Sequence, residues 1–224
     1  MPKAAPSQPK TPMQMVEALS SRVTASARSY KMATVRYLMR PPLSLRAKYA
    51  AFLLDFALQS DLIQDVLGRA GERVSDPQIA ALLLAHQREE KSRIQLVMSD
   101  LRRLGFSDAL PERAMTSGDA ALRAYCTTVS GEHPSAMLGV MLALFGVAAE
   151  VSPTVVRLLS VGSVPKEAMR WLLLRQTEDP KVLKQLLEQT AALVRDPVEQ
   201  AQLLQAVEVT GELLALGAAA RPAA

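Results

Sequence analysis

Apolar residues recur along most of the chain at intervals of three or four, which is the period of one face of an α-helix. One stripe runs from Leu45 to Val66, and another runs from Val182 to Val194. The segment 136–149 is apolar on every side, as expected for a helix buried at the centre of a bundle. No run alternates β-branched and polar residues, and no Asn-Gly or Asp-Gly hairpin turn occurs. The pattern therefore predicts an all-α protein.

Helix starts are marked by a capping residue followed by proline. The side-chain oxygen of Ser, Thr or Asp accepts a backbone N–H of the first turn, and proline at the next position leaves no N–H unpaired. Such pairs predict starts at Thr11, Asp76, Ser152, Asp179 and Asp196. With further starts near Ser44, Asp119, Pro134 and Pro165, we expect about eight or nine helices, at 12–39, 44–68, 76–104, 119–130, 134–150, 153–161, 165–178, 180–194 and 197–216.

The 224 residues are enough for one domain, and no internal repeat of fixed period is evident. We expect a single compact all-α bundle over 12–216. Residues 1–11 hold three prolines and almost no large apolar residue, so we expect a disordered basic tail there. We expect 217–224 to be a frayed C-terminal tail.

Basic residues are concentrated near the N-terminus. The first 49 residues contain nine Lys and Arg and one acid, Glu17, whereas the whole chain has a net charge of +4. The asymmetry fits a basic helix that lies against the acidic remainder of its own domain. It also fits an arm over 1–48 that binds a polyanion or a membrane surface, or an organelle transit peptide. No secretory signal is evident, so we expect a cytoplasmic protein, with organelle targeting through the N-terminus as the alternative.

Several kinds of site are excluded by composition. The chain has one cysteine, Cys126, and two histidines, His86 and His133, which cannot build a disulfide framework, a cysteine-based zinc site or a three-histidine site. No Gly-rich phosphate loop, nucleophile elbow or paired Glu-x-x-His motif is present. We therefore expect no metal and no cofactor, and we interpret Cys126 as a small buried apolar residue.

Polar residues interrupt two of the apolar stripes. His86 and Glu90 lie four residues apart in the middle of the stripe of helix 76–104, so they share one helical face. A buried carboxylate is costly unless it is paired, so the two side chains indicate either a polar pocket between helices or a His–Glu contact at the edge of the stripe. Asp55 is the only charged residue between Tyr49 and Leu58, and Tyr125 adds a phenol from another helix.

Four stretches, at 52–59, 84–105, 134–150 and 171–183, resemble core helices of the heme-oxygenase-like superfamily. That group includes TenA thiaminase-type proteins, PqqC-like proteins and the di-iron oxidases of the same fold. The resemblance covers most of 45–190 and implies a heme-oxygenase-like bundle. It further implies that Asp55 corresponds to a substrate-contacting Asp of TenA-type members.

The same resemblance departs from the di-iron pattern at most ligand positions. Glu90 and Asp179 stand where the di-iron pattern has acids. Arg93 replaces the histidine that this pattern has three residues after Glu90, and Phe145 replaces the glutamate of the central helix. The two histidines that flank Asp179 in the family are replaced, and they correspond here to Arg175 and Val182. The TenA-type catalytic cysteine is not matched, because the segment near its expected position, Leu142 to Phe145, contains no cysteine. Taken together, the resemblance implies a fold whose metal site has been lost.

These features favour a non-catalytic member of the fold, a pseudoenzyme that acts as an interaction, scaffold or accessory subunit through a protein partner or through self-association, for example as a dimer. The alternative is a metal-independent enzyme or binding protein for a small organic ligand. Its candidate pocket consists of Asp55, His86, Glu90, Tyr125 and Asp179, with Asp55 or Glu90 as general base. A third hypothesis is a polyanion or membrane-surface binder that works through 1–48.

Overall fold

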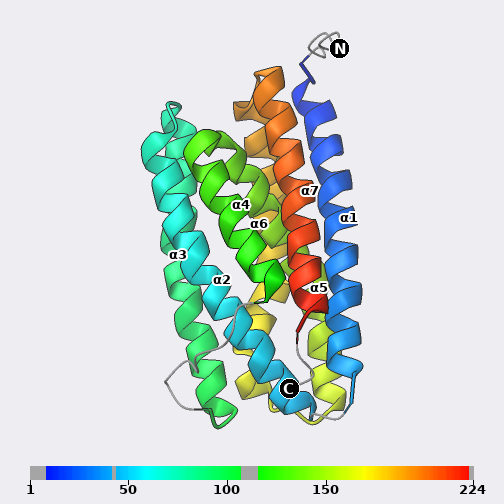
Figure 1. The fold of residues 1–224 in the computed structure, drawn as a ribbon. Coiled ribbons are helices and arrows are strands. Elements are labelled where there is room, and N and C mark those ends of the chain that lie inside the picture. Colours follow the sequence, from blue (N-terminus) through cyan, green and yellow to red (C-terminus); the bar gives the residue numbers. More distant parts are fainter. Residues whose placement is uncertain (1–8, 42–43, 107–115, 222–224) are drawn as a thin grey trace.

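The computed structural model describes residues 9–41, 44–106 and 116–221, and this part of the chain contains helices and no strand (Figure 1). Two single 3₁₀ turns, Pro134–Ala136 and Lys166–Ala168, precede the fifth and sixth helices. The α-helices are α1 (Pro12–Met39), α2 (Leu45–Arg73), α3 (Pro77–Arg103), α4 (Ser117–Glu132), α5 (Met137–Val161), α6 (Arg170–Leu193) and α7 (Pro197–Ala219). The prediction of one all-α bundle is confirmed.

Helix α5 forms the centre of the bundle and contacts α1, α2, α4, α6 and α7. The stretch Pro134–Val161 is long and apolar enough to cross a membrane, but 83% of its most apolar window is buried inside the protein. Two glycines allow the neighbours of α5 to come close. A Cβ atom at Gly139 would lie 2.4 Å from the carbonyl oxygen of Leu203 on α7, and one at Gly146 would lie 2.1 Å from Val23 on α1.

Four of the predicted helix starts are confirmed by capping hydrogen bonds. Thr11 and Gln14 form a reciprocal capping box at the start of α1, and Ser44, Asp76 and Asp196 accept backbone N–H groups at the starts of α2, α3 and α7. Helix α4 starts at Ser117, two residues earlier than predicted, because Thr116 forms a second capping box.

Two predicted helix starts are wrong. Pro153 lies inside α5 and Pro180 lies inside α6, so each of these helices is one element where the sequence predicted two. The residues before the prolines are buried and do not cap: Ser152 is 2% exposed and Asp179 is 1% exposed. A proline inside a helix removes one hydrogen bond, and tertiary packing on both sides evidently offsets that loss here.

The chain is ordered further at both ends of the domain than the sequence suggested. Residues 1–8 lie outside the described residues, but the backbone of Lys10 exchanges hydrogen bonds with Gln200 on α7, at 2.8 and 3.1 Å. Helix α7 continues to Ala219, past the predicted end at 216, and Arg221 is buried. Residues 222–224 lie outside the described part.

Side chains from neighbouring helices cap several helix ends at the end of the bundle where α1, α3 and α5 finish. Lys48 of α2 donates to the carbonyl oxygens of Leu38 (3.0 Å) and Arg40 at the end of α1. Arg46 donates to the carbonyl oxygen of Leu104 after α3, at 2.8 and 3.2 Å. These cations satisfy carbonyl groups that have no partner within their own helices.

Helix α5 ends in a left-handed turn at Ser163, whose φ is 59°. The N–H of Val164 reaches back to the carbonyl oxygen of Leu159 at 3.0 Å, which is the long hydrogen bond of a Schellman motif. Glycine is the usual residue at this position because a side chain strains the left-handed conformation.

Ser163→Gly should therefore stabilise the protein by about 1 kcal/mol, because it relieves the strain of a side chain at positive φ. The matched control is Ser160→Gly, an exposed position in the last turn of α5, where glycine should instead cost about 0.5 kcal/mol. Equilibrium denaturation measures both changes. A loss of stability in Ser163→Gly would show that the Ser163 side chain contributes more than its backbone strain costs.

Candidate functional site

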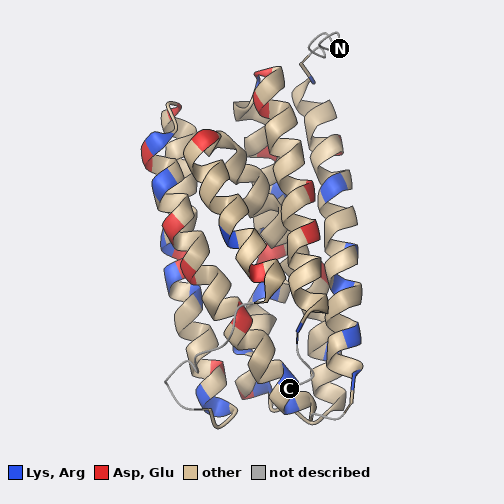
Figure 2. Ribbon diagram, viewed as in Figure 1, with Lys and Arg blue, Asp and Glu red and all other residues tan. Residues whose placement is uncertain are grey.

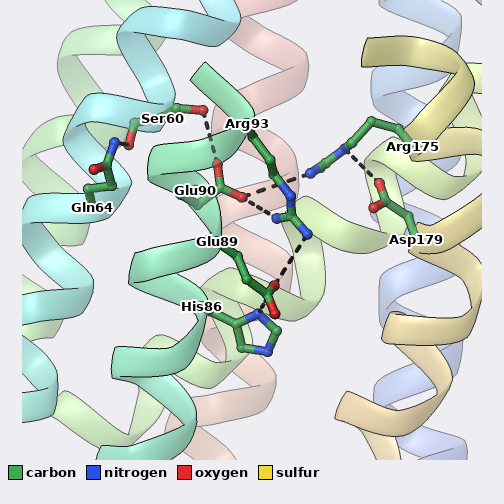
Figure 3. A network of polar contacts seen from close by, with 8 residues as sticks. All are labelled: Ser60, Gln64, His86, Glu89, Glu90, Arg93, Arg175 and Asp179. Carbon is green, nitrogen blue, oxygen red and sulfur yellow. Dashed lines mark hydrogen bonds and ion pairs between the residues drawn. The ribbon is translucent and has the colours of Figure 1, made fainter. Parts of the chain in front are cut away.

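A network of charged side chains lies inside the bundle between α2, α3 and α6 (Figure 3). It includes the predicted site residues His86, Glu90 and Asp179. It also contains Glu89, Arg93 and Arg175, which were not among the predicted pocket residues. We call it the interior network and define it as Ser60, His86, Glu89, Glu90, Arg93, Arg175 and Asp179.

Glu90 is the centre of the interior network. One carboxylate oxygen accepts a hydrogen bond from the Ser60 hydroxyl at 3.1 Å. The other is paired with the Arg93 guanidinium, and Nη1 of Arg175 lies 3.8 Å from it. Because the Glu90 side chain is only 12% exposed, these three partners replace most of its contact with water.

Arg175 and Asp179 form a second, more deeply buried pair on α6. Nε of Arg175 lies 2.7 Å from Oδ2 of Asp179, and their side chains are 3% and 1% exposed. Burial raises the pKa of Asp179 to about 6, although the neighbouring Arg175 guanidinium acts in the opposite direction. Burial likewise lowers the pKa of Arg175. Desolvation therefore opposes the charge of both partners in this pair.

Phe145 of α5 packs against both arginines. The guanidinium carbons of Arg93 and Arg175 lie 4.8 and 5.5 Å from the centre of its ring. The imidazole of His86 meets the same ring edge-on at 5.3 Å. Arg175 also lies over Phe56, at 5.3 Å. These rings supply cation–π contacts to guanidinium groups that have lost most of their water.

The structure corrects the expected partner of His86. Nδ1 of His86 lies 3.0 Å from Oε2 of Glu89, three residues along α3, and Glu90 is engaged with Ser60 and Arg93 instead. This hydrogen bond is the main reason that the pKa of Glu89 is lowered. The Glu89 side chain is 51% exposed, so this contact lies at the edge of the apolar stripe, with Glu89 in place of the predicted partner Glu90.

Asp55 belongs to a different cluster. It is paired with Arg221, which follows α7, and Arg221 also donates to the Tyr30 hydroxyl at 3.2 Å. The rings of Phe52 and Tyr37 lie 5.2 and 5.4 Å from the same guanidinium. Asp55 therefore anchors the end of α7 to α1 and α2. This pair could not be predicted from the sequence, because Arg221 falls in the segment expected to be frayed.

A small cavity lies beside Asp55, between α2 and α4, with a volume of about 70 Å³. Pockets for organic ligands usually measure about 300 Å³ or more. The space at Asp55 is therefore suited to a few water molecules and is too small for an organic substrate in this conformation.

Tyr125 and Cys126 lie on α4. No hydrogen bond or ion pair within the described ranges joins Tyr125 to His86 or Glu90. Burial raises the pKa of Tyr125 to about 12, and it raises the pKa of the Cys126 thiol to about 12 as well. A thiol of that pKa is almost entirely protonated at neutral pH, so Cys126 lacks the thiolate character that a nucleophile needs.

The residues of the interior network do not fit a metal ion. Arg93, Phe145 and Arg175 stand at positions where the resemblance implies metal ligands, and guanidinium and phenyl groups do not coordinate cations. Among the residues that the structure describes, no three His, Cys, Asp or Glu side chains gather as a metal-binding group. The positive charge that balances Glu90 and Asp179 comes from the protein's own arginines.

Arg175→Met should destabilise the protein by about 3 kcal/mol at neutral pH, because it leaves Asp179 buried without its partner. A double variant, Arg175→Met with Asp179→Leu, should recover most of that loss. The matched control is Arg69→Met, which breaks the exposed pair that Arg69 forms with Asp65 across the same spacing, and it should cost less than about 1 kcal/mol. Equal costs at the two sites, measured by denaturation, would contradict the importance of burial.

The raised pKa of Asp179 predicts a pH dependence. The folded protein takes up a proton at this site below a pKa of about 6, whereas the unfolded chain does so only near the ordinary value of 3.8. The wild-type protein should therefore lose stability relative to Asp179→Asn as the pH rises from about 4 to about 7. Free energies of unfolding measured for both proteins across this range test the sign of the effect.

No family model and no curated protein matches this chain. Two solved structures share its architecture. A domain of unknown function with a heme oxygenase-like fold from Shewanella denitrificans OS217 superposes with a TM-score of 0.75, at 16% identity, over 88% of this chain and 87% of that one. A TenA homolog from Pseudomonas syringae pv. tomato DC3000 superposes with a TM-score of 0.68, at 16% identity, over 98% of each chain.

Both likenesses extend over nearly the whole chain, and at 16% identity they concern the fold alone. The helices that they match include those that carry the interior network. This chain therefore has the heme-oxygenase-like fold that the sequence resemblance implied.

Proposed function

We propose that this chain is a non-catalytic protein of heme-oxygenase-like fold that acts through its surface as an interaction or accessory subunit. The observation that supports this role most strongly is the interior network. Glu90 and Asp179 are the acids that the resemblance assigns to the functional interior, and both are paired with buried arginines of the same chain. A general base needs a carboxylate that is free to take a proton from a substrate.

The energetics of the interior network also favour this role over a ligand pocket. An organic ligand that entered between α3 and α6 would have to part Arg175 from Glu90, the ion pair that joins these two helices, and would displace the arginine side chains from the two acids. Breaking a buried pair of this kind costs about 3–5 kcal/mol, which the ligand would have to supply before it bound with any affinity. A metal-independent enzyme or small-molecule-binding protein remains the alternative, and it requires that these pairs open.

The surface offers features that a protein partner, or a second copy of the chain, can use. A groove of about 420 Å³ lies between the first half of α3 and the end of α6. Its floor is built from Ala81, Leu82, Ala85, Ala192 and Leu193, so a partner's side chains would meet little steric hindrance and no charge. The groove lies outside the interior network, so binding there leaves the buried pairs intact.

The proposal predicts that surface variants change association and that interior variants do not. Ala85→Glu places a charge in the groove at an exposed helix position, so it should weaken partner binding at least tenfold, as burial of an unpaired charge does. Ala201→Glu on α7 is the matched control, and it should bind as the wild type does. The double variant Arg175→Met with Asp179→Leu should also bind normally. Quantitative pull-down from extracts of the source cells compares the four proteins.

Native mass spectrometry of the purified wild-type protein separates this proposal from its alternative. The expected mass is that of the chain alone or of a protein assembly. A small molecule that is retained by the wild type and absent from the interior double variant would overturn the non-catalytic role and support a ligand pocket.

A further inference from the structure

One end of the bundle carries an unusual concentration of exposed positive charge. Helices α1, α3 and α5 finish there and α2 and α6 begin there, so segments far apart in the sequence contribute to one surface (Figure 1). Figure 2 shows blue Lys and Arg segments gathered at this lower end of the molecule. We call it the basic end. Its exposed cations include Arg36, Arg40, Arg46, Arg103, Arg157, Lys166 and Arg170.

Acidic side chains balance only part of this charge, because the buried Asp100 interacts electrostatically with Arg103 and Arg170. In the described parts of the segments 36–46, 102–106 and 157–170, Glu167 is the single acid. Two other cations of α1 are balanced: Arg22 pairs with Glu208 at 2.5 Å and Lys31 with Glu150 at 2.8 Å. The sequence 107–115, outside the described residues, contains Asp108, Glu112 and Arg113, which together subtract only one charge wherever they lie.

Helix capping explains part of the basic end and leaves the rest. Arg46 caps α3, and Arg36, Arg102 and Arg103 occupy last turns, where a cation interacts favourably with the helix dipole. Arg103 and Arg170 also help to compensate the buried Asp100 carboxylate. Lys166, however, lies in the 3₁₀ turn just before α6, near a helix start where the dipole disfavours positive charge. A role in stability alone therefore does not account for all of these side chains.

Three apolar side chains protrude from the same end. Val161 is 83% exposed, Met39 is 66% exposed and Phe106 is 41% exposed. The helix ends hold them outward. Left-handed residues at Ser163 and Gly105 turn the chain just after α5 and α3, beside Val161 and Phe106. Exposed apolar side chains surrounded by cations are typical of surfaces that sit in the interface of an anionic membrane.

Other occupants fit this surface less well. A second copy placed against the basic end would bring like charges together, which disfavours a symmetric dimer there. A nucleic acid would be held by the cations, but Met39 and Val161 would have no partner on a phosphate backbone. Among the exposed large apolar side chains of the described residues, Phe106 is the only aromatic one on which a base could stack.

We propose that the basic end docks onto an anionic lipid membrane, with Val161, Met39 and Phe106 entering the headgroup region and the surrounding cations contacting lipid phosphates. This inference is independent of the proposed function, because the groove between α3 and α6 and the interior network take no part in it. In contrast to an arm formed by 1–48 alone, the surface is assembled from α1, α3, α5 and the segment that leads into α6.

Co-sedimentation with lipid vesicles tests the proposal. The full chain should bind phosphatidylcholine vesicles that contain about 30% phosphatidylserine, should bind pure phosphatidylcholine vesicles at least tenfold more weakly, and should dissociate as salt rises well above about 0.1 M. Arg40→Glu with Arg103→Glu should weaken binding to the anionic vesicles at least tenfold.

The matched control is Arg73→Glu with Arg195→Glu. These two exposed arginines occupy the opposite end of the bundle, one in the last turn of α2 and one just after α6, so the net charge changes by the same amount. This variant should bind within about twofold of the wild type, because its altered charges lie more than a Debye length from the membrane. Equal losses in both variants would reduce the effect to overall charge and overturn the proposal.

A fluorescent label tests which residues enter the membrane. Cys126 is buried, so an environment-sensitive dye can be attached selectively to Val161→Cys, and to Val198→Cys as the control at the opposite end. Anionic vesicles should shift the emission of the first label to shorter wavelengths and leave the second unchanged. Equal shifts at both positions, or the absence of vesicle binding, would overturn the proposal. Binding to an oligonucleotide without binding to vesicles would assign the basic end to nucleic acid instead.

Discussion

Two guanidinium groups buried between α3, α5 and α6 set the main constraint on this structure. A guanidinium remains charged at any physiological pH, so each of them requires a carboxylate, a hydrogen-bond acceptor or an aromatic face within a few ångströms. Glu90, Asp179 and Phe145 meet that requirement from three different helices. A bundle core made only of apolar side chains can repack in several ways, whereas this one has few arrangements that leave no charge unpaired.

The network also distinguishes the interior of this chain from the metal-binding pattern that the sequence resemblance implies. The helices that the resemblance places around a functional interior are all present, and the central helix α5 is buried as expected. The difference lies in what fills the space between them. The long side chains of Arg93 and Arg175 reach Glu90 and Asp179 and supply the positive charge beside these acids.

Much of the fold could be predicted from the sequence because its signals are local. Apolar spacing and capping residues act within one helix, and they located α1, α3, α4 and α7 to within three residues at each end. Helix α2 ends five residues later than predicted, and α5 and α6 were each predicted as two helices. The errors at Pro153 and Pro180 arise where a local signal has two meanings. Asp before Pro is a good start for a helix, but Asp179 instead faces Arg175 one turn earlier, and tertiary packing carries α6 through the proline.

The site was less predictable because its contacts are not local. On α3, His86 has acids three and four residues ahead, and both lie on its face. His86 contacts Glu89 and not Glu90 because Ser60, on another helix, donates a hydrogen bond to Glu90. Asp55 and Arg221 are 166 residues apart, and no spacing rule connects them. The resemblance located Arg93, Phe145 and Arg175 as departures, but only the fold brings their side chains together.

The pairing of these charges restricts how such a protein can change by single substitutions. Replacing Arg93 by a histidine, as in the di-iron pattern, would leave Glu89 and Glu90 short of their cation before any metal site existed to compensate. Replacing Arg175 would strand Asp179 in the same way. Each first step toward a metal-binding interior therefore passes through a destabilised chain, and several simultaneous changes are needed to avoid it. If the interior descends from a metal site, the buried arginines make the loss of that metal site hard to reverse by single substitutions.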